Sequence, residues 1–352
     1  MYREGAWRSS KRSNGLRFRR EEQAVFIEHS IRYNEVFMSL DNIMDMTDCT
    51  LCPRSCRANR AEGEVGYCKE DAELYAARAA LYFDEEPVIS GRRGSGAVFF
   101  SGCNMGCVYC QNYAIAKAMY GSRVEPSRLA DIFLELQAQD AENINLVTPS
   151  HYLNLIIPAI ENAKRQGLSI PVVYNTGTYE RVEAIKALEG LVDIWMPDFK
   201  YISPRISLAY SHTPDYFQYA SKALAEMVRQ CPRPLFADGS SSLDAEDDAD
   251  DPVMVSGVIV RHLALPGCAE DSRDILDYLH STYGDSIFIS LLNQYTPMPQ
   301  VMNDPNLGRK LTGAEYDALV DYAISIGITN GFIQDGETAS QSYIPAFDGT
   351  GL

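Results

Sequence analysis

The decisive stretch of the chain reads Phe99-Phe100-Ser101-Gly102-Cys103-Asn104-Met105-Gly106-Cys107-Val108-Tyr109-Cys110-Gln111-Asn112. Its three cysteines follow a C-x3-C-x2-C pattern, directly after an apolar run that is typical of a strand. Three thiolates on one short loop can each hold one iron of a cubane cluster, which leaves the fourth iron without a ligand from this loop. An iron with an open position binds a small molecule and reacts with it, whereas a fully ligated cluster normally only passes electrons.

The spacing separates this interpretation from three alternatives. Structural zinc sites usually pair C-x2-4-C knuckles and use four ligands. Ferredoxin runs continue to a fourth cysteine, but the next cysteine after Cys110 is Cys231. Buried core cysteines are the third alternative, and the polar and glycine residues of the loop argue against a core strand.

A second group of cysteines lies upstream and forms a C-x2-C-x3-C-x11-C pattern. Its members are Cys49, Cys52, Cys56 and Cys68. Four thiolates in one short segment can close around a single metal centre, and both zinc and a second iron–sulfur cluster suit sulfur ligation. Such a centre has no open position, so it would be structural or would transfer electrons. Unrelated free thiols and a protein-binding adaptor module are the alternatives.

Composition narrows the class of protein. The chain has 352 residues and a formal net charge of −17, which argues against nonspecific nucleic-acid binding as its main task. We find no apolar run long enough to span a bilayer and no secretory signal, so we expect a cytoplasmic protein with no membrane partner. Nine cysteines in such a chain favour metal or redox chemistry over disulfides.

Apolar segments alternate with helical segments from residue 97 onward. The predicted strands are 97–100, 144–147, 171–174, 192–196, 257–265 and 286–292. The predicted helices are 127–141, 152–166, 179–188, 215–230, 271–283 and 313–327. This alternation predicts the α/β class with a parallel partial (β/α)6 TIM-like barrel. A doubly wound sheet is the alternative, but no GxGxxG follows the first strand.

The sequence also predicts how the chain is divided into segments and domains. We expect a disordered tail at 1–20 and a helical, four-cysteine metal-binding extension at 21–75. The barrel would occupy 76–330, with an acidic disordered insert at 238–251. We expect a C-terminal tail at 331–352.

Polar residues follow the predicted strands, where functional groups gather in βα barrels. They are Ser150 and His151, Asn175 and Thr176, Asp198 and Lys200, Arg261 and His262, and Asn293 and Gln294. The two histidines are candidate acids or bases, although a hydrogen-bonded structural role is commoner for each. An ordinary ion pair at the barrel mouth is an equal alternative for Asp198 and Lys200.

The cysteine loop resembles the C-x3-C-x-aromatic-C motif of the radical S-adenosylmethionine (SAM) superfamily, with Tyr109 in the aromatic position. The segments 143–152, 173–177, 193–201 and 260–267 resemble an uncharacterised subgroup related to the pyruvate formate-lyase activating enzyme. That subgroup also carries an upstream motif like the one at 49–68. The resemblance implies a [4Fe–4S] cluster on Cys103, Cys107 and Cys110. It also implies SAM on the fourth iron, with cleavage to methionine and a 5′-deoxyadenosyl radical.

The resemblance also implies roles for the strand endings. Tyr109 would touch the adenine of SAM, or else pack under the loop. Ser150, Asn175 and Thr176 would contact the amino, ribose or carboxylate groups of SAM. Asp198 would orient SAM directly or through Lys200.

Two departures from the activating enzymes stand out. Their Gly-Gly-Glu segment, which binds the SAM amino group, is replaced by Thr148-Pro149-Ser150, and Asn175 stands where they have an aspartate of their monovalent cation site. The resemblance implies an electron donor such as flavodoxin or ferredoxin, and a glycyl-radical or other protein as a substrate. A non-catalytic iron–sulfur or zinc protein for electron transfer or partner binding is the alternative function.

Overall fold

The structure, a computed structural model, describes residues 43–243, 252–334 and 344–352. The predicted tail at 1–20, the segment 21–42 of the predicted extension and residues 244–251 of the predicted acidic insert lie outside the described residues.

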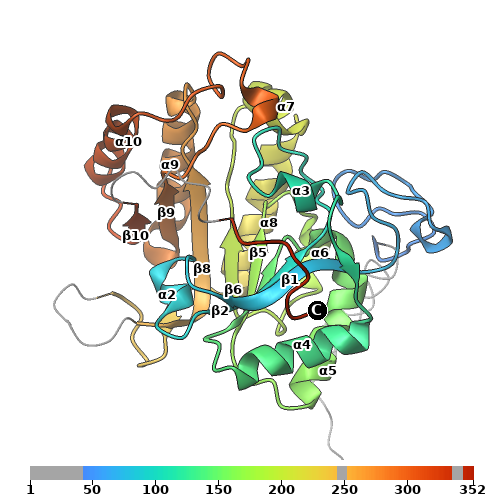
Figure 1. Cartoon of the computed structure of the whole chain (residues 1–352). Helices are drawn as coiled ribbons and strands as arrows, with labels where there is room; N and C mark the ends of the chain where they lie inside the picture. Colours follow the sequence, from blue (N-terminus) through green and yellow to red (C-terminus); the bar gives the residue numbers. More distant parts are fainter. Residues whose placement is uncertain (1–42, 244–251, 335–343) are drawn as a thin grey trace, which may run out of the picture.

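A single curved sheet forms the centre of the molecule (Figure 1). Its strands lie in the order β10-β9-β8-β6-β5-β4-β2-β1-β3. The parallel strands are β2 (Ser95–Phe100), β4 (Ile144–Val147), β5 (Val172–Thr176), β6 (Ile194–Pro197), β8 (Met254–Leu263), β9 (Phe288–Leu292) and β10 (Gly331–Ile333). The antiparallel additions are β1 (Tyr75–Tyr82) on β2, β3 (Ser122–Arg123) on β1 and β7 (Leu235–Phe236) on β8.

The longer helices cover the outside of this sheet (Figure 1). The α-helices are α2 (Pro87–Ser90), α3 (Tyr113–Ala116), α4 (Pro126–Ala138), α5 (Leu153–Arg165), α6 (Val182–Lys186), α7 (Pro204–Ser211), α8 (Tyr216–Gln230), α9 (Ala269–Tyr283) and α10 (Gly313–Ser325). The short 3-10 helices are η1 (Arg60–Glu62), η2 (Ser150–Tyr152), η3 (Gly284–Ser286) and η4 (Pro299–Val301). A capping box of Thr312 and Glu315 begins α10.

The predicted α/β class is confirmed, because the six predicted strands are β2, β4, β5, β6, β8 and β9 of a mostly parallel sheet. Most of them are buried along their whole length, as expected for parallel strands covered on both faces. The prediction was wrong at the end of the barrel, since β10 lies in the segment predicted as a tail. Three residues pairing with β9 are too few to leave a sequence pattern.

Strand β1 was not predicted either. Its sequence is rich in alanine, which has a low intrinsic preference for strands. Its place next to β2 supplies the missing stabilisation, together with the C-terminal segment 344–352. In that segment Gly349 donates to the carbonyl of Ala77 at 3.0 Å, and Ala79 donates to the carbonyl of Thr350 at 2.8 Å.

Residues 43–74, which we call the four-cysteine module, pack against the loop after β2. The main-chain amide of Cys103 donates to the carbonyl of Cys68 at 3.3 Å. The Arg181 guanidinium, in the loop after β5, donates to the Ser55 hydroxyl at 2.6 Å. Within the described residues, no helix has the length and apolar character needed to cross a membrane.

The contact between the module and the loop predicts that two glycine substitutions will lower the unfolding free energy by different amounts. Gly102 has φ +80°, and a Cβ there would lie 2.5 Å from Glu70 Cγ and 2.8 Å from the Cys68 carbonyl oxygen. Gly63 has φ +84° but nothing within 4 Å of the same position. Gly63→Ala should therefore cost only the left-handed backbone strain, roughly 1–2 kcal/mol of unfolding free energy. Gly102→Ala should cost clearly more, because the module must also move.

Chemical denaturation of the two variants beside the wild type measures this difference. Equal losses of unfolding free energy would show that the module does not restrict the space at Gly102.

Candidate functional site

A cavity of about 550 Å³ lies at the carboxyl ends of the parallel strands. All three cysteines of the loop line it. So do four other predicted site residues, namely Tyr109, Asn175, Asp198 and Lys200. Glu85 and Glu86 enter from the loop between β1 and α2, and Arg261 enters from β8. The volume falls in the range of small-molecule and cofactor sites.

The cysteine loop presents its sulfur atoms to hydrogen-bond donors. Met105 N–H donates to Cys103 Sγ at 3.4 Å, and the Ser211 hydroxyl lies 3.0 Å from Cys107 Sγ. Burial raises the pKa of Cys103 to about 11 and that of Cys110 still further, with the neighbouring thiols adding to both shifts. Thiolates here need positive charge close by, which bound iron would supply and to which the Lys200 ammonium adds. The donor set and its setting therefore fit an iron–sulfur cluster.

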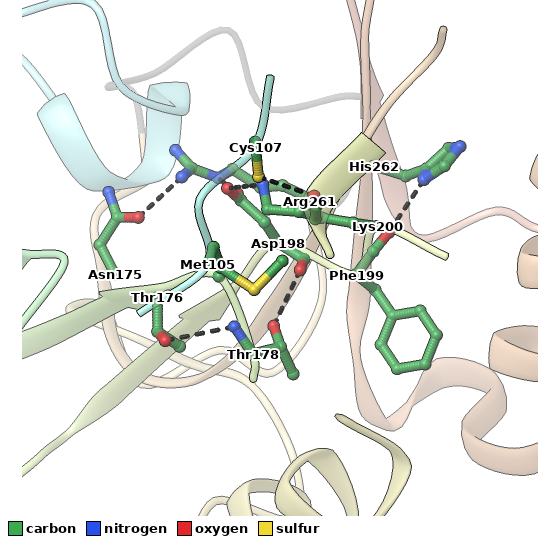
Figure 2. A network of polar contacts seen from close by, with 12 residues as sticks. Met105, Cys107, Asn175, Thr176, Thr178, Asp198, Phe199, Lys200, Arg261 and His262 are labelled. Atoms are coloured by element: carbon green, nitrogen blue, oxygen red, sulfur yellow. Dashed lines mark hydrogen bonds and ion pairs between the residues drawn. The ribbon is translucent and has the colours of Figure 1, made fainter. Parts of the chain in front are cut away.

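An ion network forms one wall of the cavity (Figure 2). Arg261 Nε lies 2.7 Å from Asp198 Oδ1, and Lys200 Nζ lies 2.8 Å from Asp198 Oδ2. Arg261 also donates to Glu85 at 3.0 Å and to Asn175 Oδ1 at 2.7 Å. Burial disfavours the charge on Asp198, but Arg261 and Lys200 outweigh it and hold its pKa below the ordinary value. Asp198 and Lys200 therefore form an ion pair, one that lines the cavity beside the cysteines.

Glu85 differs from Asp198 in the direction of its pKa shift. Burial raises the pKa of Glu85 to about 7, although the Arg261 guanidinium opposes the shift. Its Oε1 accepts from the side-chain amides of Asn145 and Asn175, at 3.1 and 3.3 Å. One wall of the cavity thus carries two carboxylates, Asp198 with a lowered pKa and Glu85 with a raised pKa.

Two predicted SAM contacts do not reach the cavity. Asn175 and Thr176 are neighbours on β5, so their side chains point to opposite faces of the strand. Asn175 faces the cavity, whereas Thr176 and Ser150 both donate hydrogen bonds to the buried carboxylate of Glu180. That carboxylate needs donors because it is 1% exposed. The structure therefore places Ser150 and Thr176 behind the cavity wall, as supports of Glu180.

Both candidate histidines have structural partners and do not line the cavity. His151 Nε2 lies 2.7 Å from the Ser101 carbonyl oxygen, and burial lowers its pKa to about 3. His262 lies 2.9 Å from both the Phe199 carbonyl oxygen and the Ser272 hydroxyl, and burial lowers its pKa to about 4. The structural role considered for each histidine agrees with these contacts.

The four-cysteine module brings at least two of its sulfur atoms together. A Cβ at Gly66 would lie 3.2 Å from Cys56 Sγ and 3.3 Å from Cys68 Sγ, so glycine leaves room for both. The fully buried Arg60 places its guanidinium 3.9 Å from Cys49 Sγ, where it would offset thiolate charge. Burial raises the pKa of Cys52 to about 12. In the part of the chain that the structure describes, no group of three or more histidine, cysteine or carboxylate side chains is gathered as ligands of one metal ion.

Three functional candidates escaped the sequence reasoning. They are Glu180, Ser211 and Arg54, and each has a partner that is remote in the chain, namely Ser150 for Glu180, Cys107 for Ser211 and the cysteine loop for Arg54. Arg54 is the only one with a local signal, since it stands between two cysteines of the module.

Residues 90–200 match the family model described as a 4Fe-4S single cluster domain. That range contains the cysteine loop and the strand endings through Lys200. The match therefore supports a 4Fe-4S cluster domain in this part of the chain.

The chain is also similar to a relative and to solved structures. The chain is 26% identical to an uncharacterized protein of Methanocaldococcus jannaschii, MJ0674, over 289 residues, which cover 78% of this chain and 74% of that protein. It is similar to SuiB of Streptococcus suis, solved with S-adenosylmethionine, with a TM-score of 0.44 and 9% identity. That alignment covers 67% of this chain and about half, 49%, of SuiB. A domain of a pyruvate-formate lyase-activating enzyme from Bacteroides vulgatus gives a TM-score of 0.34 and 13% identity, covering 52% of this chain and 92% of the domain.

Glu180 predicts a pH dependence of stability. Burial raises its pKa from 4.5 to about 7, so the folded protein keeps a proton that the unfolded chain releases between these values. The unfolding free energy should therefore fall as pH rises through this window, by on the order of 3 kcal/mol from Glu180. Glu180→Gln should flatten this part of the profile.

Denaturant unfolding at pH 5 and pH 8 measures the effect. The exposed Glu161→Gln on α5 is the control, and it should keep the wild-type difference between the two pH values. A Glu180→Gln profile as steep as that of the wild type would contradict the prediction.

Proposed function

We propose that this chain is a radical SAM enzyme that binds a [4Fe–4S] cluster on Cys103, Cys107 and Cys110 and binds SAM beside it. The observation that carries the proposal is that the three cysteines open into one cavity, which the network of Asp198, Lys200 and Arg261 also lines. The match to a 4Fe-4S single cluster domain supports the same assignment.

Once bound, the cluster and SAM supply the reductive cleavage of SAM into methionine and a 5′-deoxyadenosyl radical, with one electron from a low-potential flavodoxin or ferredoxin. The residues of this chain would bind the cluster, orient SAM beside it and exclude water from the cavity. Of the predicted SAM contacts, Tyr109, Asn175, Asp198 and Lys200 line the cavity and keep that role in the proposal. Thr148 also lines it, in the segment that replaces Gly-Gly-Glu.

The charged side chains of the site suit the charged groups of SAM. Burial opposes the charge on Lys200, but Asp198 outweighs burial, so the pKa of Lys200 is raised and it stays cationic. The ammonium and the Arg261 guanidinium suit a carboxylate, whereas the acidic side chains of Asp198 and Glu85 suit an ammonium or sulfonium group. SAM carries all three groups.

The substrate class rests on the resemblance of the strand endings to the activating-enzyme group. On that basis we propose a glycyl-radical or other protein as the acceptor of the radical. The alternative, a non-catalytic metalloprotein, makes the opposite prediction for SAM cleavage and is an outcome of the experiment below.

The first test is the replacement Cys107→Ala. It should abolish both the cluster and the formation of 5′-deoxyadenosine and methionine, because one of the three iron ligands is lost. The measurements are iron and sulfide content after anaerobic reconstitution, and product analysis after reduction with dithionite in the presence of SAM.

Cys231→Ala is the matched control, since Cys231 is also buried but lies outside the loop, 3.4 Å from the Asp193 carbonyl oxygen. It should keep both cluster and cleavage. A wild-type protein that holds a cluster, gives no cleavage with varied reductants and shows an EPR signal unaltered by SAM would support the non-catalytic alternative.

We further propose that the four-cysteine module binds a second metal centre, either zinc or an iron–sulfur cluster. Its support is the sulfur pair beside Gly66 and the guanidinium of Arg60. A variant with serine at Cys49, Cys52, Cys56 and Cys68 should lose one zinc, or the iron and sulfide of one cluster, per chain relative to the wild type. Unchanged zinc, iron and sulfide contents in anaerobically purified protein would refute this second centre.

A further inference from the structure

A line of buried hydroxyl groups ends at one sulfur of the cysteine loop. The Tyr109 hydroxyl lies 2.7 Å from that of Tyr201, which lies 2.7 Å from that of Ser211. The Ser211 hydroxyl is 3.0 Å from Cys107 Sγ. Each of the four residues is less than 10% exposed. These groups are therefore shielded from solvent and satisfy one another.

Once Cys107 is a thiolate, the donor and the acceptor of each hydrogen bond in this line are fixed. A thiolate only accepts hydrogen bonds, and a serine hydroxyl has a single proton to donate. Ser211 must then donate to Cys107 Sγ and accept from Tyr201, which in turn accepts from Tyr109. Each hydroxyl in such a chain polarises the next and strengthens the final bond.

Arg54 holds the two sides of the Ser211–Cys107 bond together. On the cysteine loop its guanidinium donates to the carbonyl oxygens of Asn104, at 2.8 Å, and Met105, at 2.6 Å. At the end of α7 it donates to the carbonyl oxygens of Ser211, at 2.9 Å, and His212, at 2.5 Å. One planar, fork-shaped cation thus joins the loop to α7, which a lysine ammonium does not reproduce.

A hydrogen bond to a cluster sulfur withdraws electron density and favours the reduced, more negative state of the cluster. Hydrogen bonds to the sulfurs are among the factors that set the reduction potential of such clusters. We propose that Ser211, positioned by Arg54, raises the reduction potential of the cluster held by Cys103, Cys107 and Cys110. This inference rests on the cluster of the proposed function, but not on SAM cleavage or on the identity of the substrate.

The test is an EPR-monitored redox titration of the anaerobically reconstituted full chain. Ser211→Ala should shift the midpoint potential to a more negative value. Ser207→Ala is the matched control, because Ser207 is also buried, lies one turn earlier on α7 and donates its hydroxyl to the Pro204 carbonyl oxygen, away from the cysteine loop. It should keep the wild-type potential. An unmoved potential in Ser211→Ala overturns the proposal.

Tyr201→Phe covers the case in which Ser211→Ala holds no cluster. It leaves Ser211 in place but removes the hydroxyl that donates to it, so a smaller shift in the same direction is expected. An unmoved potential there would also count against the proposal.

The role of Arg54 is tested by a double-mutant cycle. Arg54→Lys alone should shift the potential in the same direction as Ser211→Ala, and it should add little in the Ser211→Ala background. An equal shift in both backgrounds would show that Arg54 does not act through Ser211. A wild-type chain that assembles no cluster would overturn the proposed function itself, which differs from a cluster with an unmoved potential.

Discussion

The Arg261 guanidinium is the contact on which the cavity depends. It lies at the carboxyl end of β8 and bonds Asp198 after β6, Asn175 on β5 and Glu85 from the loop after β1. Its side chain is 14% exposed, so most of its hydration is lost on folding. A buried cation is tolerated only when acceptors surround it. The three strand ends and the acidic loop must therefore stay in register around this one group.

This requirement explains why the site is asymmetric in charge. Asp198 has two cationic neighbours, Arg261 and Lys200, that outweigh its burial, whereas burial raises the pKa of Glu85 against the opposition of Arg261. Two carboxylates within one cavity thus shift in opposite directions, because the cations outweigh burial at Asp198 but not at Glu85. The ammonium of Lys200 also acts on the cysteine loop, where it reduces the cost of holding thiolates.

The sequence was sufficient for features that depend on local pattern. Apolar runs predicted six of the parallel strands, and the cysteine spacing predicted residues that do line one cavity. Features that depend on which side-chain partner a residue finds in the fold were missed. Ser150 and Thr176 looked like cavity residues because they follow strands, but Glu180 attracts their hydroxyl groups away from the cavity. Strand β10 has three residues, and only its pairing with β9 makes it a strand.

The same distinction applies to the four-cysteine module. In the sequence it reads as an extension that ends at residue 75, before the predicted barrel. In the structure, its Cys68 carbonyl accepts a hydrogen bond from the Cys103 amide, and its Arg54 binds two carbonyl groups of the cysteine loop. A guanidinium surrounded by main-chain carbonyl groups constrains the backbone that carries the cysteines, whatever side chains stand there. The module is therefore part of the scaffold of the cysteine loop, since removing it would leave those carbonyl groups without their donor.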